Sequence, residues 1–263
     1  MRLIFIILLI TCNLLAQTPP VTNTQLPVSV QSGLVGYWAL NEASWNGTAG
    51  EVKDYTTNHL NGVRQGTAAI TTTSKFGKAG VFPYNAGKSL ILVADNDLLT
   101  LSSGMTFSCW FKKSALTAVA WGKDQTNGEF EFYLVDSGGG AGLLRFYIFD
   151  NTLNGRIVRG IANINAYLNG AWHLLTGTWD GTTNVLGIKI YIDGVKKDDG
   201  SYSAGSFTAM RNSTDPFTIG GYNTSADYSF IEQMDDVALW NRPLSLNEIT
   251  AIYRAGVGGM IIQ

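Results

Sequence analysis

The sequence is dominated by segments in which apolar residues occupy every second position. The clearest is Met-Thr-Phe-Ser-Cys-Trp-Phe-Lys over residues 105–112. Neighbouring side chains of a strand point to opposite faces, so this pattern predicts a half-buried strand with the apolar residues on one face. The same alternation predicts strands over residues 129–135, 143–149 and 188–192, with Asp-Gly turns on either side of the last one. Repeated alternation of this kind is typical of an all-β protein.

Composition agrees with a turn-rich β-protein and excludes some partners. The 263 residues include 30 glycines, and charged residues make up 14% of the chain, below the roughly 25% of an average soluble protein. The formal net charge is −2, and no basic stripe is present. Nucleic acid and anionic membranes require a basic face, so neither is an expected partner.

The N-terminal segment has the features of a secretory signal. An apolar run over residues 3–10 follows Met1-Arg2, and Ala16 is the expected cleavage site. The run is too short for a membrane span, which needs about 20 apolar residues. Residues 9–12 also approach a lipoprotein cleavage box, in which Cys12 would carry the lipid. The sequence therefore predicts a signal peptide over residues 1–16 and a secreted or cell-surface location.

A Thr-, Pro- and Val-rich linker is expected over residues 17–32, and one domain over residues 33–263. After cleavage at Ala16, Cys109 is the only remaining cysteine. Its place on the apolar face of the 105–112 strand predicts a buried, inert thiol. Asn46, Asn212 and Asn223 begin Asn-x-Ser/Thr motifs, which are glycosylation acceptors only in a cell with that machinery.

A short helix is predicted at the C-terminal end of the chain. Ser245 and Glu248 have capping-box spacing, and Ile249, Ile252 and Tyr253 form an apolar stripe of helical period. The last strand should therefore run into a helix that packs on the sheets.

Several ordered motifs resemble those of the laminin-G-like, concanavalin A-like jelly-roll family. They are Gly36-Tyr-Trp-Ala-Leu-Asn-Glu42, Lys75-Phe-Gly-Lys-Ala-Gly80, Thr178-Trp-Asp-Gly181, Ile190-Tyr-Ile-Asp-Gly194, Phe217-Thr-Ile-Gly220 and Met234-Asp-Asp-Val-Ala-Leu-Trp240. With the 105–112 strand, they extend from Gly33 to about Arg254. The resemblance implies an antiparallel β-sandwich whose first and last strands lie side by side. This architecture includes lectins, adhesion domains and some hydrolases, so the function depends on the site.

The resemblance also implies a structural calcium ion, because such domains commonly hold one. Glu42, Asp54 and Asp236 are the expected ligands, since paired terminal strands would bring them together and carboxylate oxygens suit Ca²⁺. Alternation places Asp235 and Asp236 on opposite faces, and we expect Asp236 to be the ligand, on the face of Met234 and Trp240. In the alternative, Asp54 makes a turn hydrogen bond, Asp235 is solvated, and Asp236 pairs with Arg242 or caps a loop.

Aromatic residues at outward strand positions are candidates for sugar binding. If alternation holds, Tyr133, Arg145, Tyr147 and Tyr191 point away from the core. Tyrosine rings stack on the apolar faces of sugars while polar groups bind the hydroxyls. The alternative is cross-strand aromatic packing that stabilises the sheet. Further candidates, expected in loops, are Trp45, Trp121 and Tyr222.

Catalytic patterns are incomplete in this sequence. Jelly-roll glycosidases carry a strand of spaced acids, whereas here Glu129 and Glu131 are followed by apolar residues where a third acid would stand. Neither His59 nor His173 accompanies a nucleophile motif. We therefore predict no enzyme activity. The sequence favours a secreted or surface-associated module that binds carbohydrate or a surface glycan; the alternative is a structural or adhesive protein whose jelly roll assembles with other protein subunits.

Overall fold

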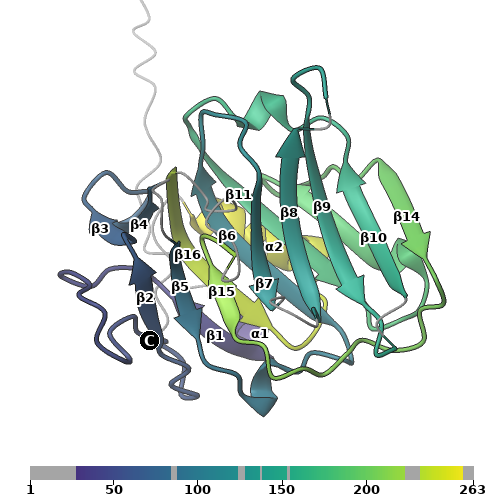
Figure 1. The fold of residues 1–263 in the computed structure, drawn as a ribbon, viewed down its shortest axis with the longest axis horizontal. Helices are drawn as coiled ribbons and strands as arrows, with labels where there is room; N and C mark the ends of the chain where they lie inside the picture. The colour runs from purple at the N-terminus through teal and green to yellow at the C-terminus, as the bar shows by residue number, and fades with distance from the viewer. Residues whose placement is uncertain are drawn as a thin grey trace, which may run out of the picture.

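A computed structural model describes residues 28–83, 88–123, 128–136, 138–152, 155–222 and 232–256. These residues form two antiparallel sheets of eight strands each, packed face to face as a sandwich (Figure 1). The predicted all-β sandwich with a short C-terminal helix is confirmed. The predicted signal peptide, Cys12 and Asn223 lie outside the described residues.

One sheet, sheet A, contains the first and last strands of the domain. Its path is β13-β12-β11-β6-β16-β4-β3, and β1 also pairs with β16. The strands are β1 (Leu34–Trp38), β3 (Ala69–Thr71), β4 (Ala79–Phe82), β6 (Met105–Lys112), β11 (Trp172–Trp179), β12 (Ile188–Ile192), β13 (Val195–Lys196) and β16 (Glu232–Trp240). The β1–β16 pair is antiparallel, with Tyr37 opposite Ala238. The two terminal strands therefore lie side by side, as the resemblance implies.

The other sheet, sheet B, faces the viewer in Figure 1 and has the order β14-β10-β9-β8-β7-β15-β5-β2. Its strands are β2 (Gly62–Gly66), β5 (Ser89–Val93), β7 (Val119–Lys123), β8 (Phe130–Asp136), β9 (Gly142–Phe149), β10 (Arg156–Ile161), β14 (Gly200–Ala204) and β15 (Phe217–Ile219). The connections include the 3-10 turns η1 (Asp97–Leu99), η2 (Asn165–Tyr167) and η3 (Val185–Gly187).

The main core fills the space between the two sheets. Phe107 of β6 contacts the rings of Trp121 and Phe132 from sheet B, and Phe132 stacks on Phe146 with ring centroids 4.2 Å apart. The predicted burial of Cys109 is confirmed: it is free and fully buried, and burial raises the pKa of its thiol far above the ordinary value.

The outer face of sheet A is covered, so β6 is not half-buried as predicted. Thr106, Ser108 and Trp110, on the polar side of the alternation, are buried together with the apolar side. A second apolar cluster explains this, because helix α2 (Leu246–Ala255) packs on this face with Ile249 and Ile252. Alternation identifies the more polar face of a strand but does not reveal a helix that covers it.

Helix α2 begins as the sequence predicts. Ser245 accepts a hydrogen bond from the Glu248 N–H and the Glu248 carboxylate accepts one from the Ser245 N–H, which completes a capping box. Ile249, Ile252 and Ala255 are its buried residues. None of the helices within the described ranges is long and apolar enough to cross a membrane.

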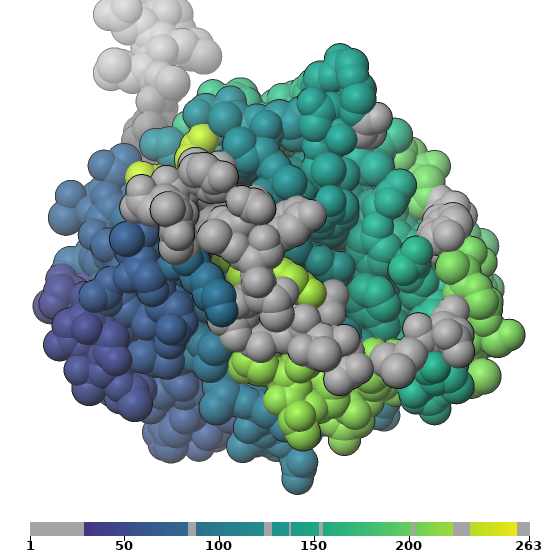
Figure 2. Space-filling view, in the orientation of Figure 1, coloured from purple at the N-terminus to yellow at the C-terminus, as the bar shows by residue number. Residues whose placement is uncertain are grey.

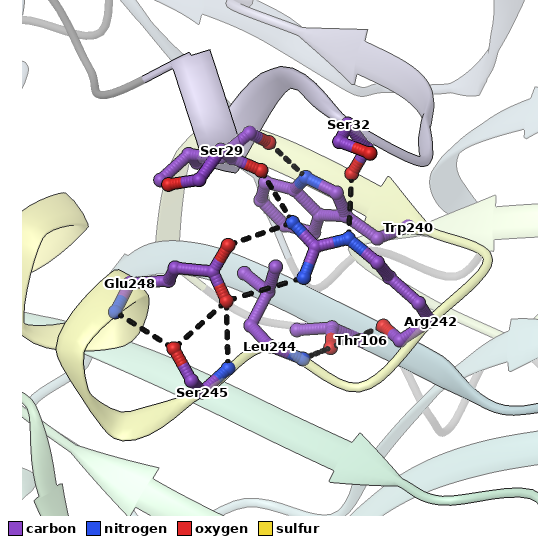
Figure 3. A network of polar contacts seen from close by, with 9 residues as sticks. Ser29, Ser32, Thr106, Trp240, Arg242, Leu244, Ser245 and Glu248 are labelled. Atoms are coloured by element: carbon purple, nitrogen blue, oxygen red, sulfur yellow. Dashed lines mark hydrogen bonds and ion pairs between the residues drawn. The ribbon is translucent and has the colours of Figure 1, made fainter.

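The predicted linker is too long at its C-terminal end, because residues 28–32 belong to the folded domain. They include helix α1 (Val28–Gln31), and Val30 is 1% exposed. The Trp240 indole donates to the Val30 carbonyl at 2.7 Å. Figure 3 shows Arg242 between the Ser29 and Ser32 carbonyls on one side and the Glu248 carboxylate on the other. These contacts fasten the start of the domain to its last strand and helix.

Candidate functional site

The candidate site is a hollow on the outer face of sheet B. Strand pairing places Tyr133 of β8 opposite Arg145 of β9, and Glu131 opposite Tyr147. The residues that alternate with them, Phe132, Leu134, Phe146 and Ile148, are buried in the core. The side chains of Glu131, Tyr133, Arg145 and Tyr147 therefore project from the opposite, outer face of the sheet. This face is turned to the viewer in Figure 2, with β7 to β10 in teal and green.

The hollow has a volume of about 300 Å³, which is at the lower end for small-molecule sites. It is lined by Ala120, Glu131, Tyr133, Tyr147, Phe149, Arg156 and Tyr222. Aromatic carbon and two oppositely charged groups therefore surround one space.

The aromatic rings of the hollow hold one another in place. Tyr147 stacks on Phe149 with centroids 5.7 Å apart and planes at 8°, and it meets Tyr133 edge-on at 6.4 Å. The Arg156 guanidinium lies 5.9 Å from the Tyr147 ring centre. Tyr147 is 8% exposed, whereas Tyr133 and Phe149 are half-buried. The Tyr147 ring is therefore largely covered by its neighbours, and the rings of Tyr133 and Phe149 are more accessible to a ligand.

Arg145 connects this hollow to a smaller one on the same sheet. Its guanidinium donates to the Tyr147 hydroxyl at 3.0 Å. It also lines a space of about 130 Å³ together with Leu143, Val158, Gly160, Ala162, Asp199 and Gly200. Of the four predicted sugar-binding residues, Tyr133, Arg145 and Tyr147 are thus neighbours on one face.

Tyr191, the fourth, belongs to the other sheet and does not join this group. It lies on β12, is 6% exposed, and packs in the cluster beneath α2. The alternation was correct that Tyr191 points away from the main core, but that face of sheet A is covered. Among the loop candidates, Tyr222 lines the hollow, whereas Trp121 is a buried core residue of β7 and Trp45 is buried with its indole N–H on Glu42.

The structure does not gather the three predicted calcium ligands into one group of carboxylates. Asp54 accepts hydrogen bonds at both carboxylate oxygens, from backbone N–H groups of Tyr37, Thr56 and Leu60 and from the Thr56 hydroxyl. Glu42 accepts from the Trp45 indole and the Lys53 N–H. Across the described ranges, no three His, Cys, Asp or Glu side chains gather in a group that could hold a metal ion.

Asp54 and Asp236 bind opposite ends of the same residue, Tyr37. The Tyr37 N–H donates to Asp54 at 2.9 Å, while the Tyr37 hydroxyl donates to Asp236 at 2.5 Å. Asp54 therefore holds the loop after β1, including the turn bond that the alternative envisaged, and Asp236 lies at the other end of the ring.

Asp235 and Asp236 depart from simple alternation because β16 contains a bulge. The register with β6 shifts between Asp235 and Ala238, and Asp236 has a positive φ of 48°. Asp235 lies opposite Trp110, and both acids are buried on the outer side of sheet A. Two parts of the alternative are wrong: Asp235 is buried and not solvated, and Arg242 pairs with Glu248 and not with Asp236.

The two acids of the candidate catalytic strand have different environments. Glu131 lines the hollow. Glu129 precedes β8 and is fully buried, where it contacts the Lys123 ammonium and accepts from the Ser213 N–H. They do not face each other across a common open cleft, as a glycosidase pair would.

Sequence reasoning missed Arg156 and the role of Glu131 in this site. Arg156 lies on β10, whose sequence Arg-Ile-Val-Arg-Gly-Ile has no regular alternation and gave no strand signal. Glu131 was considered only as half of an acid pair. These residues come together because β8, β9 and β10 pair side by side in the structure, and the local sequence pattern does not reveal this pairing.

Two antiparallel sheets packed face to face, with the first and last strands paired, are the architecture of a concanavalin A-like jelly roll. Residues 85–250 match the model of the concanavalin A-like lectin/glucanases superfamily, and the chain belongs to this family. No curated protein sequence matches the chain.

Similar solved structures include binding domains of larger proteins. The binding domain of Paraclostridial Mosquitocidal Protein 1 superposes with a TM-score of 0.64 at 16% identity, over 85% of this chain and 52% of that one. Domain 4 of AbnA, a GH43 extracellular arabinanase from Geobacillus stearothermophilus in complex with arabinotriose, gives 0.55 at 21% identity, over 84% and 98%. The binding domain of botulinum neurotoxin DC in complex with SialylT gives 0.59 at 13%, over 86% and 52%. This chain thus spans about half the length of the toxin domains, and at these identities the likeness concerns the fold.

Proposed function

We propose that this protein is a secreted carbohydrate-binding module whose ligand occupies the hollow on the outer face of sheet B. The observation that carries the proposal is the group of Tyr133, Tyr147 and Phe149 beside Glu131 and Arg156 in one space of about 300 Å³. Rings of this kind stack on the apolar faces of sugars, and the flanking charges can hydrogen-bond hydroxyl groups. The arabinotriose complex of an arabinanase domain with the same fold supports the choice of ligand class.

A non-catalytic role is part of this proposal. Glycoside hydrolysis needs two carboxyl groups on opposite sides of the scissile bond with separated pKa values. Glu131 stands in the hollow, whereas Glu129 is engaged by Lys123 and Ser213. The binding domains among the similar structures are consistent with a role in attachment.

A glycan array, followed by titration of the best glycan, tests the proposal. Tyr133→Ala should weaken binding about fivefold, the equivalent of roughly 1 kcal/mol of stacking, because this ring is half-buried at the hollow. Tyr55→Ala is the matched control, since Tyr55 is 49% exposed and lies outside the hollow. An array without signal, combined with concentration-dependent self-assembly, would favour the alternative of a structural or adhesive protein.

The calcium ion implied by the resemblance stays a prediction without a defined ligand set. Thermal melting before and after treatment with EDTA tests it independently of sugar binding. A bound ion stabilises by about 2.7 kcal/mol at 100 times its dissociation constant, so chelation should lower the melting temperature. Superimposable melting curves, with metal removal verified by elemental analysis, would exclude a structural ion.

A further inference from the structure

A buried lysine lies between two carboxyl groups at one end of sheet B. Lys123 is the last residue of β7, and its side chain is fully buried. Its ammonium nitrogen lies 2.9 Å from Asp95 Oδ1, contacts Glu129 Oε1, and donates to the Ser213 carbonyl at 2.8 Å. The cluster stands outside the sugar-binding hollow and takes no part in the proposed function.

The two carboxyl groups differ in their surroundings. The Glu129 side chain is fully buried, and its Oε2 has no hydrogen-bond partner among the described residues. Burial raises the pKa of Glu129, against the lowering effect of Lys123 and Ser213. The Asp95 side chain is 32% exposed. Glu129 is therefore placed to exchange a proton with the Lys123 ammonium. Asp95 is partly exposed to solvent, so a water molecule formed at its carboxyl group could leave.

The cluster lies where two strands of sheet B are joined by few pairing positions. Strand β15 separates β5 from β7, and it is only three residues long. It pairs with β7 at a single position, Thr218 opposite Gly122. Asp95 follows the end of β5 and Lys123 ends β7, so the two residues meet across the weakest pairing of sheet B.

We propose that Lys123 and Asp95 form an intramolecular isopeptide bond, with Glu129 as the proton carrier. Glu129 takes a proton from the Lys123 ammonium and passes it to the Asp95 carboxylate, and the neutral amine attacks Asp95 Cγ. Glu129 then takes the second nitrogen proton and transfers it to the departing hydroxyl. A C–N bond forms, a C–O bond breaks, one water molecule leaves, and Glu129 ends ionised as it began.

Peptide mapping of the folded wild-type protein tests this proposal. Trypsin should not cleave at an amidated Lys123, so residues 89–112 and 114–145 should appear as one branched species lighter by one water than their sum. Asp95→Ala and Lys123→Arg should give unlinked peptides of full mass. Glu129→Gln, which keeps the size of the side chain, should do the same.

Two outcomes would exclude the proposed link between Lys123 and Asp95. One is a wild-type protein that melts cooperatively yet yields separate linear peptides cleaved after Lys123. The other is fragmentation that places the link on Glu129, since residues 114–145 would then lose water without joining residues 89–112. A link that still forms in Glu129→Gln would remove Glu129 from the chemistry. Because the wild-type map is decisive alone, a variant that fails to fold does not affect the test.

Discussion

At the scale of single residues, Tyr37 shows how hydrogen bonding divides acids that a motif places together. Its N–H donates to Asp54 and its hydroxyl donates to Asp236, so the two carboxylates bind the backbone and the side-chain end of the same residue. Asp236 adopts a left-handed backbone, which Asp and Asn tolerate better than most residues. Asp235 beside it accepts from the N–H groups of Lys75 and Phe76. These acids organise the terminal strands of the sandwich.

The proximity of Asp235 and Asp236 makes stability depend on pH. Burial, together with the charge of Asp236, raises the pKa of Asp235 from 3.8 to about 8. A carboxyl with a raised folded-state pKa contributes stability that is present below its unfolded pKa and is lost as the pH rises through the folded value. The protein should therefore lose stability between about pH 4 and pH 8 through this group.

Asp236→Asn should reduce this loss, because it removes a neighbouring negative charge and asparagine still tolerates a positive φ. Melting temperatures measured from pH 5 to pH 9 should decline less steeply in the variant than in the wild type. Asp136→Asn is a control, since Asp136 is exposed at the end of β8. Parallel curves for the wild type and Asp236→Asn would contradict the assigned coupling.

At the scale of secondary-structure elements, Arg242 joins α1, β16 and α2. It binds the carbonyls of Ser29 and Ser32 and pairs with Glu248 at 2.8 Å. Glu248 also completes the capping box with Ser245. Loss of an N-cap costs about 1 kcal/mol in typical helices. A single carboxylate thus fixes the start of α2 and, through Arg242, the entry of the chain into the domain.

The coupling of Arg242 and Glu248 should disappear in acid. The hydrogen bond from Arg242, the largest cause, lowers the pKa of Glu248 to about 2. This contribution is therefore present above the ordinary value of 4.5 and is lost as the pH falls through about 2. A double-mutant cycle with Glu248→Gln and Arg242→Gln should give a favourable coupling at pH 7 that vanishes near pH 2. A coupling that is independent of pH would show that the pair acts through packing.

At the scale of the whole molecule, alternation and ordered motifs predicted the sandwich, and spacing predicted the cap of α2. The cover on sheet A was not predictable in the same way, because strand alternation does not say where a helix from another part of the chain will pack. Tyr191 was therefore expected on an open face and lies beneath α2, in the same cluster as Trp110 of β6. The hollow was predicted in part, since Tyr133 and Tyr147 follow alternation, whereas Arg156 depends on pairing between β9 and β10. The bulge at Asp235 and Asp236 is a register effect that no local pattern revealed.

The last prediction concerns the N-terminal boundary of the domain. A chain that begins at Gly33, the boundary expected from sequence, should be less stable than one that begins at Val28. It lacks buried Val30, the bond from the Trp240 indole to the Val30 carbonyl, and the two carbonyls that bind Arg242. A buried valine contributes about 1.5–3 kcal/mol and a hydrogen bond about 1 kcal/mol, so a loss of about 2.5–4 kcal/mol is expected. Urea unfolding of the two chains measures it, and Val30→Ala in the longer chain should reproduce only the packing part. Equal midpoints would mean that residues 28–32 rest on the sandwich without stabilising it.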